Sequence, residues 1–271
     1  MTGIFVVMSK RLFLFAAFIQ DGIVDDALVY YVRALSRVGD VVFCMDSSCE
    51  ETEISKLKPY VLQAMRGRHY EYDFGSYKRD FLWARDNLNL QDYDFVYLVN
   101  DSVYGPIANV DLENVLVGLE AKGDFIGMVE NADAGVAAHI QSWFVGVSRK
   151  IANSGMFADF MMSITRQDNK SNIVAKYEVG LSQMIVKNFH VDIKTIFKQD
   201  ARICNHVYRH PWIAMKNGVP FIKKTAVKNM LSKRFLKKYI GNDKLYKNII
   251  STGVWIRFRP FKLLQVILSG F

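Results

Sequence analysis

Short apolar runs alternate along the first part of the chain with segments whose apolar residues recur at helical spacing. Residues 12–18 and 41–45 are apolar runs, as expected for strands buried on both faces of a sheet. Between them, the spacing of apolar residues over 24–38, closed by Gly39, predicts an amphipathic helix. A short helix is predicted near residues 51–57. This alternation is typical of an α/β domain.

The same alternation continues towards residue 190. Further strands are predicted at residues 94–99, 125–129 and 140–147. Further helices are predicted at residues 76–87, 110–121, 151–162 and 176–188. Strands that alternate with helices predict a mostly parallel sheet with helical layers on both faces. Ligands of such sheets bind beyond the carboxyl ends of the strands, where the polar residues after Val99 lie.

Composition is consistent with one large domain. The chain has 271 residues, of which 51% are apolar and 23% charged, enough for a substantial core. Lys10 and Arg11 before an apolar run resemble a signal peptide, but no cleavage site follows, and a first buried strand explains the run better. No stretch reaches the roughly 18 to 20 apolar residues that span a bilayer. Cys44, Cys49 and Cys204 fit no metal-ligand spacing, which favours a reducing cytoplasm.

The net charge of +8 is concentrated at the C-terminus. Residues 223–271 carry +11, so residues 1–222 carry −3. In residues 228–247, cations alternate with apolar side chains in a pattern typical of a helix lying in a membrane interface. A packed helical hairpin is the alternative, and the acidic body disfavours nucleic acid as a partner. We predict a catalytic domain at 1–222 and a basic, helical, membrane-associating segment at 223–271.

The first motif with candidate chemistry is Y-D-F-G-S-Y-K-R at residues 72–79. Gly75 leads into the predicted helix, and Ser76 is a candidate N-cap. Free backbone N–H groups at a helix start attract an anion, and Lys78 or Arg79 could neutralise a pyrophosphate there. The alternative is an ordinary solvated helix start with surface charges.

The second motif is N-D-S-V-Y-G-P at residues 100–106, directly after a predicted strand. The Asp101 carboxylate is suited to a divalent cation, Mg²⁺ or Mn²⁺, which would bridge the two phosphates of a nucleotide sugar. The alternative is a turn in which Asp101 or Asn100 accepts hydrogen bonds from the following backbone.

Four segments together resemble the rhamnan synthesis F family of polysaccharide glycosyltransferases. They are H-Y-E-Y-D-F-G-S-Y-K at 69–78, N-D-S-V-Y-G-P at 100–106, H-I-Q-S-W-F at 139–144 and G-V-P-F-I-K at 218–223. The resemblance implies a GT-A-like αβα sandwich that binds a nucleotide sugar. It also implies transfer of a sugar, with dTDP-rhamnose as the expected donor, to a lipid-linked glycan during synthesis of bacterial surface polysaccharide such as O-antigen or capsule.

The resemblance also suggests which side chains contact the substrate. The expected substrate-binding residues are Asp46, Asp73, Gly75, Ser76, Lys78, Arg79, Asn100, Ser102, Tyr104, His139, Gln141 and Trp143. In the inverting transferases whose pattern runs N-x-G, A-R-N and D-x-D, the last motif has two acids. Here the corresponding motif, at residues 100–102, keeps only Asp101, so metal affinity is weak or metal is dispensable, and Lys78, Arg79 or a histidine would then carry the phosphate charge.

An inverting transfer needs a base that takes the proton of the attacking acceptor hydroxyl. Glu178, in Y-E-V-G-L-S-Q at 177–183, resembles the late acidic residue of inverting transferases and is our candidate, with Asp101 as the second catalytic residue. An ordinary glutamate in the first turn of a helix is the alternative interpretation of Glu178. Glu130 and Asp133 are competing carboxylates.

Several other polar and aromatic residues have two interpretations each. His139 is structural or a donor to substrate, and Trp143 stacks on a sugar or packs in the core. Asp46, at the end of a strand, receives the nucleotide or closes a turn. His210 is a candidate late ligand to metal or phosphate, and Lys223 is a weaker candidate for phosphate contact.

The sequence therefore supports two classes of function. The first is a glycosyltransferase at the inner face of the plasma membrane, with a nucleotide-sugar donor, a lipid-linked glycan acceptor, an anionic membrane surface and other polysaccharide-assembly enzymes as partners. The second is a non-catalytic module that binds a glycan or nucleotide sugar and is anchored by its basic tail.

Overall fold

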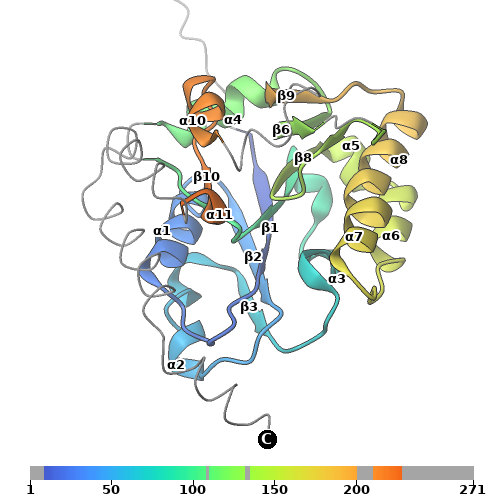
Figure 1. Cartoon of the computed structure of the whole chain (residues 1–271). Helices are drawn as coiled ribbons and strands as arrows, with labels where there is room; N and C mark the ends of the chain where they lie inside the picture. The colour runs from blue at the N-terminus through green and yellow to red at the C-terminus, as the bar shows by residue number, and fades with distance from the viewer. Residues whose placement is uncertain (1–8, 108–109, 132–134, 200–209, 228–271) are drawn as a thin grey trace, which may run out of the picture.

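An eight-stranded mixed sheet forms the centre of the computed structural model, which describes residues 9–107, 110–131, 135–199 and 210–227 (Figure 1). Its strands are β1 (Arg11–Ala17), β2 (Asp40–Met45), β3 (Gln63–Arg66), β4 (Phe95–Asn100), β6 (Phe125–Asn131), β7 (His139–Ile140), β8 (Phe144–Ser148) and β9 (Lys194–Lys198). The strand order is β3-β2-β1-β4-β8-β6-β7, and β9 pairs with β6. A separate two-stranded sheet joins β5 (Val103–Tyr104) to β10 (Ile222–Lys223).

The sheet is parallel where the site is built. Strands β3, β2, β1 and β4 run parallel to their neighbours, whereas β8 runs antiparallel to β4 and β6. Strands β7 and β8 both pair antiparallel with β6. The mostly parallel α/β sheet expected from the sequence is confirmed.

Helices cover both faces of the sheet. On one face lie α1 (Asp26–Leu35), α2 (Glu51–Ile54), α4 (Leu112–Glu120) and α10 (Pro211–Lys216). On the other lie α3 (Tyr72–Asn87), α5 (Arg149–Ala152), α6 (Gly155–Met162), α7 (Lys170–Ile173) and α8 (Gly180–Phe189) (Figure 1). Successive side chains of β1 point to opposite faces, so Phe13 and Phe15 pack with α1 while Leu12 and Leu14 pack with α3. The two cores make the expected αβα sandwich.

Several predicted boundaries differ from the structure. Helix α3 begins at Tyr72, so Ser76 is a buried residue inside the helix and the prediction that it is the N-cap is wrong. The predicted strand at 140–147 is divided into β7 and β8, and the helix at 151–162 into α5 and α6, because the Ser154 side chain caps a new helix. The predicted helix at 176–188 begins inside a π-helix (Val174–Val179), which follows α7, and continues as α8.

The C-terminal part of the described chain returns to the body. Strand β10 pairs antiparallel with β5, and α11 (Lys224–Val227) follows it at once. The predicted boundary between residues 222 and 223 therefore falls inside β10. The predicted amphipathic segment at 228–247 lies outside the described residues. Over the part of the chain that is described, no helix combines the length and apolar character needed to cross a membrane.

Candidate active site

The carboxyl ends of β1, β2 and β4 lie side by side, because these strands are parallel neighbours. Asp101 directly follows β4, and its backbone N–H donates to the Ala16 carbonyl of β1 at 3.1 Å. Its Oδ1 accepts from the backbone N–H of Phe18 at 3.4 Å. The strand register thus fixes this carboxylate at the sheet edge where α/β proteins bind ligands.

The first turn of α3 meets the end of β4 at the same edge. Asn100 Nδ2 donates to Asp73 Oδ2 at 3.0 Å. Asn100 Oδ1 accepts from Ser102 twice, from the backbone N–H at 3.0 Å and from the hydroxyl at 2.5 Å. The two motifs that the sequence singled out therefore form one hydrogen-bonded cluster, as the transferase hypothesis requires.

Two lysines reach this cluster from β10 and α11. Lys223 is buried, and its Nζ donates to Ser102 Oγ at 3.0 Å and lies 5.3 Å from the centroid of the Trp143 ring. Lys224 Nζ donates to Asp101 Oδ2 at 3.1 Å. Their positions follow from the β5–β10 pairing, which holds residue 223 opposite Val103.

Glu178 comes from the π-helix on the α3 side. Its Oε2 accepts from the backbone N–H of Ser142 at 2.7 Å and also from the Ser142 hydroxyl. Its Oε1 lies 3.4 Å from Nε2 of the buried His139, whose Nδ1 donates to the Ala137 carbonyl at 2.8 Å. Tyr77 of α3 donates to the Ser142 carbonyl at 2.8 Å, which ties the segment carrying Ser142 to the helix of Asp73.

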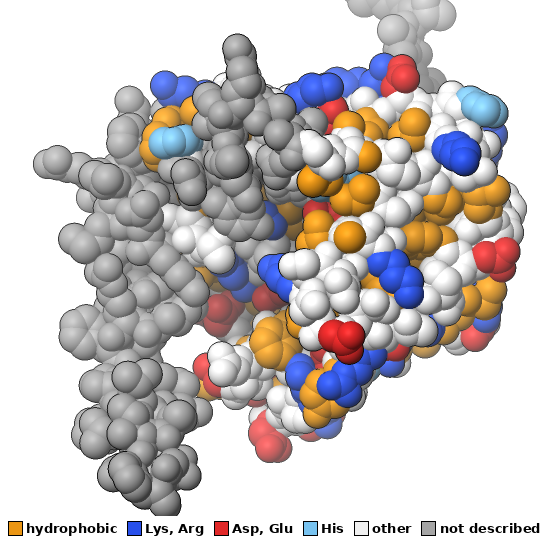
Figure 2. Space-filling model, turned by 45° about the vertical axis from the view of Figure 1, so that its right-hand side comes forward, with side chains coloured by type: hydrophobic (Ala, Val, Ile, Leu, Met, Phe, Trp, Pro, Cys, Tyr) orange, Lys and Arg blue, Asp and Glu red, His pale blue; other side chains and the backbone are white. Residues whose placement is uncertain are grey.

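We refer to this group of side chains as the charged site: Asp73, Asn100, Asp101, Ser102, Glu178, Lys223 and Lys224. Its members act on one another electrostatically. Burial, together with the Asp101 carboxylate, raises the pKa of Asp73 to about 7 against the opposing effect of Lys223. Burial lowers the pKa of Lys223 to about 8 although Glu178 and Asp73 act to raise it. Figure 2 shows acidic and basic side chains side by side near the hollowed centre of one face of the molecule.

Two further groups of the site, Glu178 and Lys224, are shifted towards their charged forms. Burial raises the pKa of Glu178, but hydrogen bonds from His139 and Ser142 outweigh it and hold the pKa below the ordinary value. Burial lowers the pKa of Lys224, but the Asp101 and Asp25 carboxylates outweigh it, and the pKa lies above the ordinary value. Both side chains are therefore ionised at neutral pH.

The donors that the described residues place around Asp101 do not fit a divalent cation. Among the described residues, no group of three or more His, Cys, Asp and Glu side chains is arranged to hold a metal. Asp101 Oδ2 already accepts from an ammonium group, and hard cations require several oxygen ligands. His210, the other predicted ligand, is the residue before α10 and packs against Trp212 at a centroid distance of 5.0 Å.

The other α3 residues predicted to contact the substrate interact with groups other than Asn100. Lys78 Nζ donates to the Ile164 carbonyl at 2.8 Å, and Arg79 pairs with Glu71. Ser76 Oγ lies 3.0 Å from His69 Nε2. Gly75 has a packing role, because a Cβ there would lie 2.3 Å from Glu71 Cβ. The α3 residue in the charged site is Asp73.

Asp46 organises the loop that precedes α3. Its Oδ1 accepts from the backbone N–H groups of His69 at 2.7 Å and Tyr70 at 3.2 Å. Tyr70 and Tyr72 adopt left-handed backbone conformations, with φ of 62° and 58°, which non-glycine residues seldom do. Arg68 lies over the Tyr70 ring, 4.5 Å from its centroid. These contacts favour the turn interpretation of Asp46.

The aromatic residues and their polar neighbours lie mainly in the core. Trp143 is buried, packs on Phe221 and donates from Nε1 to Gln141 Oε1 at 2.7 Å. Tyr104 is buried in β5 beneath Lys224, whose Nζ lies 5.5 Å from the ring centroid. The core interpretation of Trp143 is therefore the one that its environment supports.

Sequence reasoning missed three contributors to the site. Ser142 holds Glu178, Lys224 holds Asp101, and the charge of Lys170 acts on both Asp73 and Lys223. Ser142 lies in one of the resembling segments and Lys224 next to another, so those segments were the signal that could have found them. Lys170 is an exposed residue of α7 and carried no such signal.

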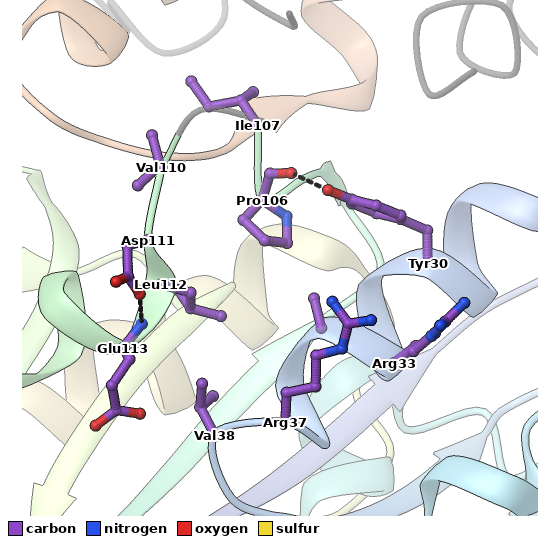
Figure 3. A pocket seen from close by; sticks show the side chains of 11 residues that line it. Tyr30, Arg33, Arg37, Val38, Pro106, Ile107, Val110, Asp111, Leu112 and Glu113 are labelled. Carbon is purple, nitrogen blue, oxygen red and sulfur yellow. Dashed lines mark hydrogen bonds between the residues drawn. The ribbon is translucent and has the colours of Figure 1, made fainter. Parts of the chain in front are cut away.

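A pocket of about 390 Å³ lies elsewhere, between α1 and the segment that leads into α4 (Figure 3). Tyr30 donates to the Pro106 carbonyl at 3.0 Å across it, and Arg33 and Arg37 line its α1 side. None of the site residues predicted from the sequence lines it.

Solved structures resemble the chain only distantly. Core-mannan synthase A from Aspergillus fumigatus, in a form with manganese and GDP, is 9% identical with a TM-score of 0.33, and the match covers 58% of this chain and 64% of that one. The mannosyltransferase Ktr4p from S. cerevisiae is 8% identical with a TM-score of 0.36, and the match covers 57% of this chain and 59% of that one. A protein from Desulfovibrio desulfuricans assigned as a nucleotide-diphospho-sugar transferase is 13% identical with a TM-score of 0.38, and the match covers 70% of this chain and 81% of that one.

These overlaps carry no argument about activity, and the chain spans less than two thirds of the length of the two fungal structures. Comparison with curated proteins gives no match. The sequence profile of rhamnan synthesis protein F, in contrast, matches residues 41–256, which is most of the chain and includes every residue of the charged site. The chain is a member of the rhamnan synthesis protein F family.

Proposed function

We propose that the protein is a glycosyltransferase that moves a sugar from a nucleotide-sugar donor to a glycan acceptor at the charged site. Membership of the rhamnan synthesis protein F family supports an enzyme of polysaccharide synthesis. The αβα sandwich, with polar residues at the carboxyl ends of parallel strands, supports a nucleotide-binding, GT-A-like body.

The observation that carries the proposal is the contact between Asn100 and Asp73. Their 3.0 Å hydrogen bond joins the two motifs, and Lys223 and Glu178 act on the same carboxyl group of Asp73. Cations that can bind a diphosphate and a carboxylate that can accept a proton are therefore close together, as glycosyl transfer requires.

Glu178 is the proposed base. The acceptor hydroxyl oxygen would attack the anomeric carbon, the bond from that carbon to the diphosphate oxygen would break, and the hydroxyl proton would pass to the Glu178 carboxylate. The nucleoside diphosphate leaves with the bonding electrons, and the configuration at the anomeric carbon inverts. The hydrogen bonds from Ser142 fix the carboxylate in one orientation and keep it ionised.

We further propose that the donor is dTDP-rhamnose and that the acceptor is a lipid-linked glycan. The basic segment would bind the enzyme to the inner face of the plasma membrane. The family name supports rhamnose and surface polysaccharide. The net charge of +11 over residues 223–271 supports contact with an anionic leaflet.

The test is turnover of nucleotide sugars by the purified full-length protein. We expect release of nucleoside diphosphate from one member of a panel of dTDP, UDP and GDP sugars, and its loss in Glu178→Gln. Binding of a donor without turnover, with any acceptor, would instead support the non-catalytic binding module. A panel that neither binds nor reacts would contradict both.

A further inference from the structure

Backbone hydrogen bonds fix where Lys223 and Lys224 enter the charged site. The backbone N–H of Lys224 donates to the Ser102 carbonyl at 2.9 Å, and Lys223 is opposite Val103 in the β5–β10 ladder. Lys223 is only 6% exposed, beside the ring of Trp143. Each ammonium group also makes a hydrogen bond within the site.

The two ammonium groups already contact oxygen atoms that a metal ion bound at Asp101 would use as ligands. One lies 3.0 Å from Ser102 Oγ and the other 3.1 Å from Asp101 Oδ2. A divalent cation bound to Asp101 would have to displace Lys224 and lie close to two positive charges, which repel it. The described part of the chain supplies no cluster of carboxylates or histidines to offset that repulsion.

The electrostatics of the site favour an incoming anion. Burial lowers the pKa of Lys223 to about 8 even though the Glu178 and Asp73 carboxylates act to raise it, so a further negative charge beside it would favour the protonated ammonium form. The charge of the exposed Lys170 also acts on Lys223 and lowers its pKa further. A diphosphate would supply negative charge and hydrogen-bond acceptors to these ammonium groups.

We propose that Lys223 and Lys224, rather than a divalent metal ion, bind and neutralise the diphosphate of the donor. This inference rests on the proposed function and concerns the same site. In the transfer step the negative charge that develops on the leaving diphosphate is stabilised by the two ammonium groups.

Calorimetric titration of the full-length protein tests the inference. The probes are dTDP, UDP and GDP, each in the presence of EDTA and again with Mn²⁺. We expect one of them to bind with the same affinity, within about threefold, under both conditions. Lys223→Met and Lys224→Met should each weaken that binding by about tenfold or more, as expected for loss of a charge-assisted contact. Lys216→Met, in the exposed last turn of α10, is the matched control and should bind as the wild type does.

A second readout separates ligand contact from a structural role of Lys223. At pH 8, close to the pKa of about 8 of Lys223, a bound diphosphate should raise the protonated fraction of this side chain and draw protons onto the protein. Titrations in buffers of different ionisation enthalpy measure this uptake, which should be absent in Lys223→Met, and circular dichroism shows that the variant is folded.

The outcomes are distinct. Binding that occurs with Mn²⁺ and disappears in EDTA overturns the inference while the proposed function stands. Unchanged affinity and proton uptake in folded Lys223→Met also overturn it. Absence of binding by all three nucleotides in both conditions contradicts the proposed function itself.

Discussion

Glu178 differs from the surface glutamates by what surrounds it. Its carboxylate accepts two hydrogen bonds from Ser142 and lies 3.4 Å from His139. Residue 178 itself lies in a one-turn π-helix. A single-turn π-helix inside a longer helix is frequent at functional sites. The local sequence alone allowed an ordinary helix-start glutamate, and the contacts favour a positioned group.

Glu178→Gln should reduce kcat by about 10²–10⁴-fold, the usual contribution of a general base, because glutamine has no proton-accepting carboxylate. Donor affinity, measured by titration, should change by less than about threefold, because the variant keeps the shape of the side chain. Glu130→Gln is the comparator, since Glu130 is a buried carboxylate that pairs with Lys198 at 2.8 Å. Loss of transfer in Glu130→Gln with normal transfer in Glu178→Gln would mean that Glu130, and not Glu178, is the general base.

Asp73 is the group whose ionisation the fold opposes. Its folded-state pKa is raised to about 7, so its contribution to stability is present below the unfolded pKa and is lost as pH rises through 7. An asparagine side chain at this position would not titrate and would still accept the hydrogen bond from Asn100. Asp73→Asn should therefore raise the melting temperature relative to wild type, by an amount that grows from pH 5 to pH 7.5.

Thermal unfolding at half-unit pH steps checks this difference. Asp86→Asn, which alters a carboxylate that is 62% exposed on the same helix, is the control and should show a much smaller pH dependence. A difference between Asp73→Asn and wild type that is constant or falls with pH would show that burial does not disfavour the Asp73 carboxylate.

At the level of elements, the strongly patterned segments were predictable and the edges were not. Strands β1, β2 and β4 are apolar on both faces, so the sequence marks them clearly. Strand β3 has the sequence QAMR and β9 has KTIFK, both half-exposed with mixed polarity, and neither was predicted. The start of α3 was missed because Tyr70 and Tyr72 take left-handed conformations that glycine normally marks.

The junction of β1 with α4 holds a buried ion cluster. Arg11 is fully buried and pairs with Glu120 at 2.5 Å and Glu113 at 2.7 Å, while Tyr97 donates to Glu120 at 2.6 Å. Replacing the cation leaves Glu120, only 6% exposed, without its partner. Arg11→Met should lower the free energy of unfolding by about 3–5 kcal/mol, as breaking one side of a buried pair does.

Urea denaturation followed by circular dichroism measures this loss. The double variant Arg11→Met with Glu120→Leu should recover only part of it, because the more buried carboxylate is then removed while Glu113 still lacks its cation and the Tyr97 hydroxyl loses its acceptor. A loss below about 1 kcal/mol in Arg11→Met would mean that the pair behaves like a solvent-exposed one.

For the whole molecule, the sequence predicted which motifs meet but not everything that completes the site. Asp73 and Asn100 come together because one begins a helix beside the sheet and the other ends a parallel strand. Lys223 and Lys224 join them from more than a hundred positions along the chain, through a two-residue strand whose pairing has no hydrophobic period to reveal it. Lys78 and Arg79 were favoured instead because they are close in sequence.

The charge asymmetry of the chain leads to a prediction about membranes. Residues 223–271 carry +11 against −3 for the rest, and each cation near an anionic surface contributes about 1 kcal/mol. Full-length protein should sediment with vesicles containing phosphatidylserine, and less so as salt rises. Lys237→Glu with Lys238→Glu should weaken this binding about tenfold or more, whereas Lys150→Glu, at an exposed position of α5, should not. Equal binding by both variants, or binding to neutral vesicles alone, would exclude the charged segment as the anchor.

A crystal structure of the full-length protein with a bound donor or nucleoside diphosphate would show at once whether a nucleotide sugar binds at the charged site. We expect the diphosphate within hydrogen-bonding distance of Lys223 and Lys224, with the sugar facing Glu178. A diphosphate bound elsewhere, such as in the pocket lined by Arg33 and Arg37, would contradict the assignment of the charged site.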